Sequence, residues 1–319
     1  MSDVGRLVLI AKLVLIPLGV ATLIYAMISQ SVLGESKHID VGMLGLAVIV
    51  NQVALTLYAI RMRSVLRVFN IALPYLDAKR IHLQSMFYYF FVPMAVGLEI
   101  ARYVKIRHVV PNTRQADLVI SLFADRLLGL VAAILVALAA LPFVRIAGIG
   151  EVDVRLSTTL AAVFGSAIAV LVVAWRMGWL ERGLKQIAKV QMSPAHVVPA
   201  IVACLLMQLA MGATVWAGAI GLGIEASLAD SVFGVSIGVV AMVIPISVLG
   251  AGAAEVAGVL AFLFVGMSAS EAAALAALAF SGKLIGAIQG GIWDAIEGGL
   301  AFRSTPVVAK AGRAPEDGL

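Results

Sequence analysis

Long apolar segments alternate with short polar ones along nearly the whole chain, a pattern typical of helices packed in a lipid bilayer. A helix needs about 20 apolar residues to cross the hydrocarbon core, and most of these segments approach that length. They lie at Leu7–Ile28, Val41–Ile60, His82–Gly97, Leu118–Val144, Leu156–Trp175, Val197–Ile220, Val232–Val248, Ala253–Val265 and Ala272–Leu300. The pattern predicts an all-α fold, a polytopic helical bundle integral to a membrane.

Three of the segments are poor candidates for a full crossing. His82–Gly97 and Ala253–Val265 are short, and Val232–Val248 runs into a stretch with proline and glycine. Irregular backbone is tolerated at membrane depth only where protein or a water-filled cavity surrounds it. We therefore predict re-entrant or broken helices at these places.

Charges between the apolar segments predict the orientation of the chain, because lysine and arginine in short loops mark the cytoplasmic side. Basic stretches at Arg61–Arg80, Arg102–Arg114 and Arg176–Lys189 are expected in the cytoplasm. The stretches expected outside are balanced or acidic: Gly34–Asp40, Glu151–Arg155 and Glu225–Asp230. Both termini are then cytoplasmic, with six full crossings.

The same assignment gives two re-entrant hairpins, around His82–Gly97 and Val232–Val265, that enter from opposite faces. Such a pair amounts to a weak inverted repeat. We expect residues 1–302 to form a single transmembrane domain and residues 303–319 to form a disordered cytoplasmic tail.

Composition supports the membrane prediction and narrows the chemistry. Of 319 residues, 62% are hydrophobic and 13% charged, and the mean hydropathy of +1.06 lies far outside the range of soluble domains. The net charge of +5 does not indicate a nucleic-acid partner, because the basic residues cluster between apolar segments. The lone Cys204, four histidines without metal spacing and the lack of a P-loop lysine predict no metal and no cofactor.

The first candidate site combines a helix break with two charges. Pro93 and Gly97 interrupt an apolar segment, and Glu99 and Arg102 follow three residues apart, on one face of a helix. Backbone groups and charged side chains at such a break can meet a polar ligand at membrane depth. The alternative is an ion pair at a helix end near the cytoplasmic boundary.

The second candidate site repeats this arrangement. Pro245, Ser247, Gly250 and Gly252 precede Glu255, which has no basic neighbour in sequence. A glutamate at membrane depth needs a proton, a partner on another helix or water, so a functional role is favoured over a glycine-packed bend. Because paired broken segments mark the binding site of many transporters, we expect the two sites to face each other.

Other charges inside apolar segments also need partners. Asp125 and Arg126 point about 100° apart on a helix, so each should pair with a different helix. The planar guanidinium of Arg126 suits a phosphate headgroup. For Lys283, ligand contact competes with snorkelling or with pairing to Glu255. Three polar residues are expected to form interhelical hydrogen bonds: Asn51, Gln52 and Gln208.

Four features, in order, resemble the lysylphosphatidylglycerol synthase transmembrane (flippase-like) family over nearly the whole chain. They are Arg61-Met62-Arg63, Pro93 to Arg102, Asp117 to Asp125-Arg126-Leu127-Leu128-Gly129-Leu130, and Pro245 to Glu255. The resemblance implies a stand-alone member without a synthase domain, located in a bacterial cytoplasmic (inner) membrane. Asp125 replaces the usual glutamate and Ala251 a common glycine, so lysylphosphatidylglycerol need not be the substrate.

The leading hypothesis is a translocase that moves a polar-headgroup lipid or lipid-linked precursor between leaflets through a cavity between the hairpins. Arg126, Arg102 and Lys283 would neutralise the headgroup, while Glu99 and Glu255 would orient these cations or exchange protons. The implied partners are membrane lipids, whether anionic, aminoacylated, hopanoid or polyprenyl-linked, and a homo-oligomer or partner enzyme stays open.

The alternative hypothesis is a non-transporting scaffold for a separate lipid- or glycan-modifying enzyme. An intramembrane enzyme is disfavoured, because the sequence offers no nucleophile–base pair or metal cluster. We therefore assign no catalytic residue.

Overall fold

The computed structural model describes residues 39–90, 96–144, 176, 193–242, 247–248 and 251–297, and these are almost entirely helical. The elements are α2 (Val41–Val68), α3 (Tyr75–Tyr89), α4 (Val96–Val109), α5 (Gln115–Ala140), the 3-10 turn η1 (Leu141–Phe143), α8 (Pro194–Gly221), α9 (Leu228–Ala241), α10 (Ala253–Phe264) and α11 (Ala269–Glu297). Before α10, β1 (Ser247–Val248) and β2 (Ala251–Gly252) form a two-residue antiparallel pair. The all-α prediction is confirmed.

Four of the described helices are long and apolar enough to cross a membrane: α2, α5 with η1, α8 and α11. They correspond to four of the six predicted crossings. The other two, Leu7–Ile28 and Leu156–Trp175, lie outside the described residues, as does the predicted tail at 303–319. The chain is thus a multi-pass membrane protein.

Local sequence fixes where α2 begins and ends. Its N-cap is Asp40, whose side chain accepts a hydrogen bond from the Met43 amide at 3.1 Å. It ends where Asn70 adopts a positive φ of 59° and the Ile71 amide bonds back to the Leu66 carbonyl at 3.0 Å. Asparagine tolerates this left-handed conformation better than most residues, so it stops the helix.

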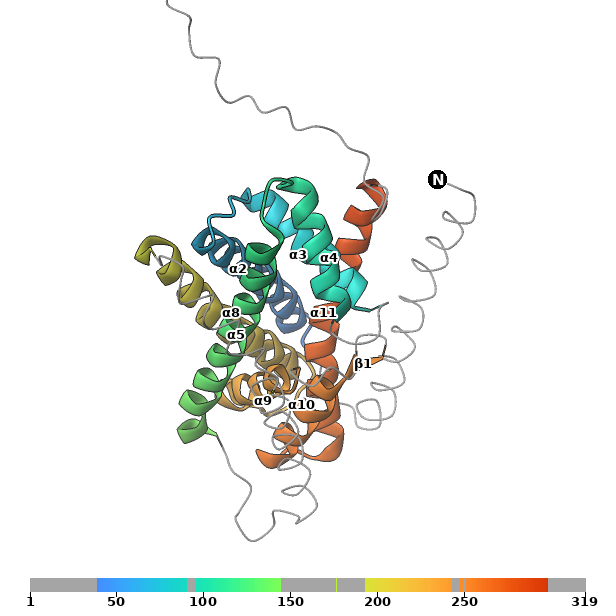
Figure 1. Cartoon of the computed structure of the whole chain (residues 1–319). Coiled ribbons are helices and arrows are strands. Elements are labelled where there is room, and N and C mark those ends of the chain that lie inside the picture. Colours follow the sequence, from blue (N-terminus) through green and yellow to red (C-terminus); the bar gives the residue numbers. More distant parts are fainter. Residues whose placement is uncertain are drawn as a thin grey trace, which may run out of the picture.

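The remaining helices form two short hairpins, α3–α4 and α9–α10, each with its two helices packed side by side (Figure 1). The longest of the four, α3, has 15 residues, or roughly 22 Å at 1.5 Å per residue. A bilayer core is about 30 Å thick. These helices are therefore too short for a perpendicular crossing.

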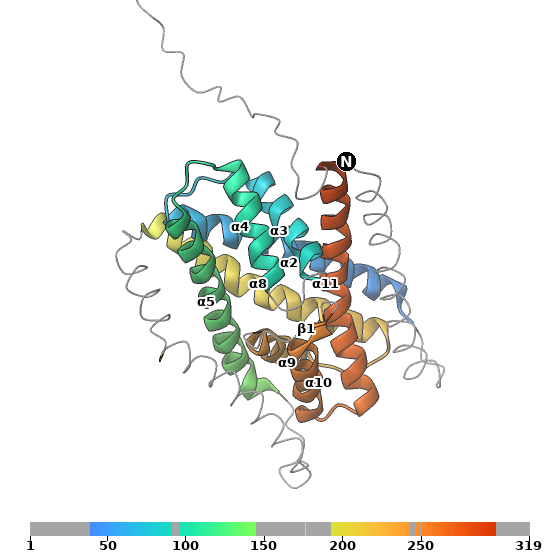
Figure 2. The same cartoon turned by 45° about the vertical axis from the view of Figure 1, so that its right-hand side comes forward.

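Described residues that flank the two hairpin turns pack together in the interior. Met242, next to the end of α9, packs against a cluster that includes Tyr89 and Phe90 at the end of α3 and Leu98 near the start of α4. The described parts of the two candidate sites therefore lie close together. Helix α11 packs against α3 and α10 and so touches both hairpins, while α2 and α8 pack lengthwise against each other (Figure 2).

Two predicted segment boundaries are wrong. The second apolar segment was expected to end at Ile60, but α2 continues to Val68 and buries Arg61, which is 3% exposed. Arg102 and Lys105 were expected in a basic loop, yet both lie fully buried in α4. A prediction from hydropathy ends an apolar segment at the first charged residue. In the folded protein, a carboxylate on another helix can keep that charged residue buried.

The close packing of α11 on α3 can be tested by a glycine substitution. A Cβ on Gly290 of α11 would collide with the backbone carbonyl of Leu83 on α3. Gly290→Ala should therefore lower the free energy of unfolding by about 3 kcal/mol, because backbone must move apart. Unfolding of the purified protein in detergent would measure the change.

Gly45→Ala provides the matched control on α2. No atom lies within 4 Å of the Cβ position there, so the better helix propensity of alanine should stabilise the protein by up to about 1 kcal/mol. If Gly290→Ala were as stable as Gly45→Ala, the close packing of α3 on α11 would be contradicted.

Candidate functional site

A cavity of about 510 Å³ lies between the two hairpins and is lined by residues from every described α-helix of the fold. Its volume is in the usual range for small-molecule binding pockets, about 300–1,000 Å³. Much of its wall is apolar, with Leu55, Leu130, Met211 and Phe262 among the lining residues. Five charged residues also line it: Arg61, Glu99, Arg126, Glu255 and Lys283.

One charged group in the wall is the pair Glu99–Arg126. Arg126 Nε donates to Glu99 Oε1 at 2.7 Å, and the two side chains are 32% and 24% exposed. Glu99 lies in the first turn of α4, where the helix dipole favours a carboxylate. The pair joins hairpin α3–α4 to the long helix α5.

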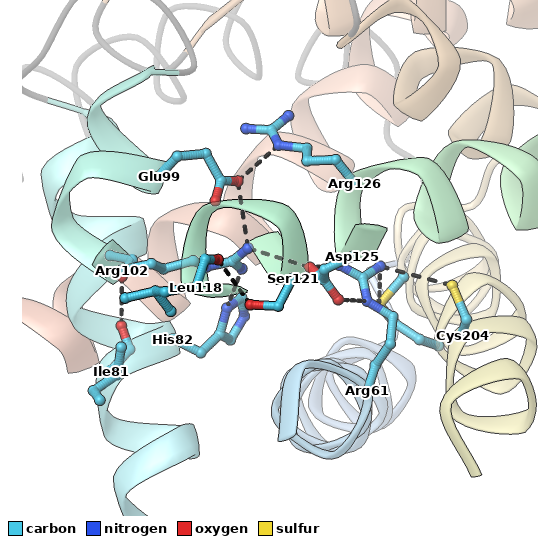
Figure 3. A network of polar contacts seen from close by, with 12 residues as sticks. Arg61, Ile81, His82, Glu99, Arg102, Leu118, Ser121, Asp125, Arg126 and Cys204 are labelled. Carbon is cyan, nitrogen blue, oxygen red and sulfur yellow. Dashed lines mark hydrogen bonds and ion pairs between the residues drawn. The ribbon is translucent and has the colours of Figure 1, made fainter. Parts of the chain in front are cut away.

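A buried ionic network lies directly behind this pair (Figure 3). Arg61 donates through Nε and Nη2 to the two carboxylate oxygens of Asp125, at 2.8 and 2.7 Å. Arg102 Nη1 lies 3.4 Å from both Asp125 Oδ2 and Glu99 Oε1. Among the residues that the structure describes, three guanidinium groups thus meet two carboxylates.

The local sequence Asp125-Arg126-Leu127-Leu128-Gly129 explains how this cluster fits between helices. Asp125 and Gly129 are one turn apart on α5 and share a face, which is turned toward α2. A Cβ on Gly129 would lie 2.9 Å from Arg61 Nη1. Glycine here makes room for the guanidinium that Asp125 holds. The prediction that Asp125 and Arg126 pair with different helices is confirmed.

The second charged group in the wall is Lys283–Glu255. Lys283 Nζ donates to Glu255 Oε1 at 2.6 Å, with the side chains 16% and 17% exposed. The other carboxylate oxygen accepts from the Gly252 amide at 2.7 Å and so caps the start of α10. The pairing with Glu255 that the sequence left open as an alternative is present, and the pair joins hairpin α9–α10 to α11.

The two charged groups lie at different levels of the cavity along α2. Arg61 bonds to Asp125, so the pair Glu99–Arg126 lies near the Arg61 end of α2. Asn51 donates to the carbonyl of Gly282, the residue before Lys283, at 3.2 Å, so the pair Lys283–Glu255 lies near Asn51. Ten residues separate Asn51 from Arg61, roughly 15 Å of helix. Apolar side chains line the wall between them. The cavity therefore offers two polar stations.

The structure separates the predicted site residues into two groups. Glu99, Arg126, Glu255 and Lys283 line the cavity. Arg102 and Asp125 are 0% and 1% exposed and are not among the lining residues. These two contact the lining residues Glu99, Arg61 and His82, so they are positioning residues.

The residues predicted to break the helices are only partly described. Gly97 is buried in the first turn of α4, Gly252 immediately precedes α10, and the backbone of Ser247 is in β1. Pro93, Pro245 and Gly250 lie outside the described residues.

Sequence reasoning missed three residues in the cavity wall: Tyr58, Arg61 and His82. The guanidinium of Arg61 lies over the Tyr58 ring at 4.1 Å from its centroid, and that ring stacks on His82 with centroids 4.1 Å apart. The need of Asp125 for a cation could have pointed to Arg61. Nothing in the sequence distinguishes His82 from a residue at a segment end.

The described segments contain no group of three or more histidine, cysteine, aspartate or glutamate residues arranged to hold an ion. Cys204 is buried, with Sγ 3.7 Å from Arg61 Nη1, and packs in the core between α5 and α8.

Comparison with known families adds one finding to this geometry. A family model described as the lysylphosphatidylglycerol synthase TM region matches residues 8–287, a range that includes every lining residue of the cavity. Comparisons with curated proteins and with solved structures gave no significant match.

Proposed function

We propose that this chain, which belongs to the lysylphosphatidylglycerol synthase transmembrane family, is a translocase that carries a phosphate-bearing lipid headgroup between leaflets. The observation that carries the proposal is that Arg126 and Lys283, each paired with a glutamate, lie in the wall of one cavity between two hairpins. Charged side chains at membrane depth are costly and are typical of substrate pathways. Both cations can bind an anionic headgroup.

Glu99 allows this binding without leaving a bare cation. In the structure it already neutralises Arg126 through one hydrogen bond at 2.7 Å. A phosphate group suits the planar donor fork of arginine and can accept two parallel hydrogen bonds. The headgroup would therefore exchange with the carboxylate, so that Arg126 keeps an anionic partner throughout.

At the second station, the headgroup would in the same way take the place of Glu255 beside Lys283. Lysine is a compact cation that binds phosphate without a fixed orientation, which suits a site that a headgroup occupies briefly. Glu255 stays held by the Gly252 amide when Lys283 turns to a ligand. The headgroup would pass between the two stations while its acyl chains stay in the lipid.

The hairpins supply access in this proposal. Because their helices are shorter than the bilayer core, we infer that they are re-entrant from opposite faces, with their turns near the middle. The proposed location is a bacterial inner membrane with both termini cytoplasmic. The proposed partners are membrane lipids, and we propose no catalytic role.

Reconstituted liposomes test the proposal. The double variant Arg126→Gln and Glu255→Gln should move a fluorescent phosphatidylglycerol between leaflets at least about tenfold more slowly than wild type, because both stations lose a charge. The assay follows quenching of outer-leaflet fluorescence. Aminoacylated and polyprenyl-phosphate lipids would be tested in parallel.

Arg67→Gln combined with Asp40→Asn is the matched control, since it also removes one cation and one carboxylate but neither residue lines the cavity. It should move lipid as wild type does. Equal rates for wild type and the double variant with every lipid would overturn the proposal and would favour the scaffold hypothesis. Co-purification of an enzyme would then support the scaffold.

A further inference from the structure

The two stations differ in what their glutamates keep when a phosphate group takes the paired cation. Glu99 lies 2.7 Å from Arg126 and also 3.4 Å from the buried Arg102. It lies in the first turn of α4, where the helix dipole favours a carboxylate. Glu99 therefore still has a cation beside it when Arg126 turns to a headgroup, and it can stay ionised.

Glu255 has a different set of neighbours. Within the described part of the chain, the cation that pairs with it is Lys283, at 2.6 Å. Its second carboxylate oxygen accepts from the Gly252 amide at 2.7 Å. That amide holds the carboxyl group in place but has no formal charge. When Lys283 turns to a headgroup, Glu255 loses its cationic partner.

The elements around Glu255 offer no second cation to replace Lys283. Helix α10 packs against α9, α11 and β2. Apart from Lys283, the ionisable residues of these three elements are all carboxylates: Asp230 on α9, and Glu271, Asp294 and Glu297 on α11. Residues 243–250, which precede α10, contain no ionisable side chain. The cations Arg61 and Arg126 lie at the first station.

A phosphate group at Lys283 would therefore place a second anion beside Glu255. A carboxylate at membrane depth is costly without a cation, and a nearby like charge disfavours its ionised form. A proton on Glu255 Oε1 removes both penalties. The neutral acid can donate this proton to a phosphate oxygen, while Oε2 still accepts from the Gly252 amide.

We propose that Glu255 takes up one proton from water when a phosphate-bearing headgroup binds Lys283, and returns it to water when the headgroup leaves. The second station is then a proton-binding site as well as a headgroup site. The first station takes a headgroup without a proton, because Glu99 keeps Arg102. The inference rests on the proposed function and deepens it, because it names the ion coupled to lipid movement.

Proton uptake at the second station alone tests this coupling. Arg126→Gln with Glu99→Gln replaces the ion pair of the first station by neutral amides. In weakly buffered detergent solution with a pH-sensitive dye, this double variant should take up about one proton per dioctanoyl phosphatidylglycerol bound, and its dissociation constant should rise about tenfold per pH unit. The phosphodiester of this probe keeps its single charge near neutral pH, so the proton binds to the protein.

Two further substitutions in this double variant identify the group that binds the proton. Glu255→Gln should abolish the uptake and make binding independent of pH, because an amide is neutral throughout. Glu271→Gln is the matched control on α11, at a residue that does not line the cavity, and it should keep the uptake. Dioctanoylglycerol, which has no phosphate, should cause none. Uptake that persists with Glu255→Gln, or lipid binding without uptake when Glu255 is present, would overturn the inference.

Lipid movement by the wild type gives a measurement that needs no change at the first station. In liposomes its rate should fall as the pH rises, by up to about tenfold per pH unit, because the headgroup reaches the second station only with a proton on Glu255. With Glu255→Gln alone, the rate should not depend on pH.

The same assays separate this inference from the proposed function. If wild type moves lipid at a rate that is independent of pH, the proton coupling falls and the translocase proposal stands. If wild type neither binds nor moves any phosphate-bearing lipid, both fall.

Discussion

Asp125→Asn should lower the free energy of unfolding by about 3–5 kcal/mol, because it leaves a buried guanidinium without its carboxylate. Arg61 is 3% exposed and gives both of its short ionic hydrogen bonds to Asp125. Arginine cannot escape the penalty by losing its proton. Unfolding in detergent, by heat or by added SDS, measures the loss.

Asp77→Asn is the control for Asp125→Asn. It breaks the pair with Arg80, in which the side chains are 25% and 30% exposed, so the loss should stay below about 1 kcal/mol. Replacing the whole buried pair, by Arg61→Met with Asp125→Leu, removes both charges and should recover much of the stability. A single variant as stable as wild type would contradict the importance of the pair.

Asp294→Ala should have an effect of similar size in a second buried network. Asp294 accepts from Lys105 Nζ at 2.8 Å and from the Tyr88 hydroxyl at 2.7 Å. The Lys105 and Asp294 side chains are 0% and 2% exposed. Removing the carboxylate takes away the buried ionic partner of the ammonium, at a cost of about 3–5 kcal/mol. It should also loosen hairpin α3–α4 from α11, visible as faster hydrogen exchange in α4.

Tyr88→Phe should destabilise the protein less than Asp294→Ala, because it removes one hydrogen bond to Asp294 and keeps the ion pair with Lys105. We expect a loss of about 2 kcal/mol, the range for a hydrogen bond to a charged group. A larger loss for Tyr88→Phe than for Asp294→Ala would show that the ion pair does not anchor the hairpin.

The two networks suggest how stability and function are divided around the cavity. Arg61–Asp125 and Lys105–Asp294 are almost fully buried, so they hold helices together. Glu99–Arg126 and Glu255–Lys283 are partly exposed to the cavity and can exchange partners at lower cost. In the proposed translocase, the Asp125 and Asp294 variants should therefore reduce lipid movement mainly by reducing the amount of folded protein.

The sequence by itself determined the helical membrane fold, the two interrupted regions and four of the five charged residues of the cavity wall. Charges inside apolar segments are rare and costly, so Glu99, Arg126, Glu255 and Lys283 stand out without any structure. The predicted hydrogen bonds between helices were also confirmed for Asn51, with Gly282, and for Gln208, with Ser236.

Only the tertiary structure decided the roles of Arg61, His82 and Lys105. Arg61 and His82 lie at the ends of predicted segments and Lys105 lies between two of them, where the sequence pattern predicts loop residues. Arg61 is buried by a partner 64 positions away, and Lys105 by one 189 positions away. A hydropathy pattern records the chemistry of neighbours along the chain, but the free energy of a buried charge depends on neighbours in space.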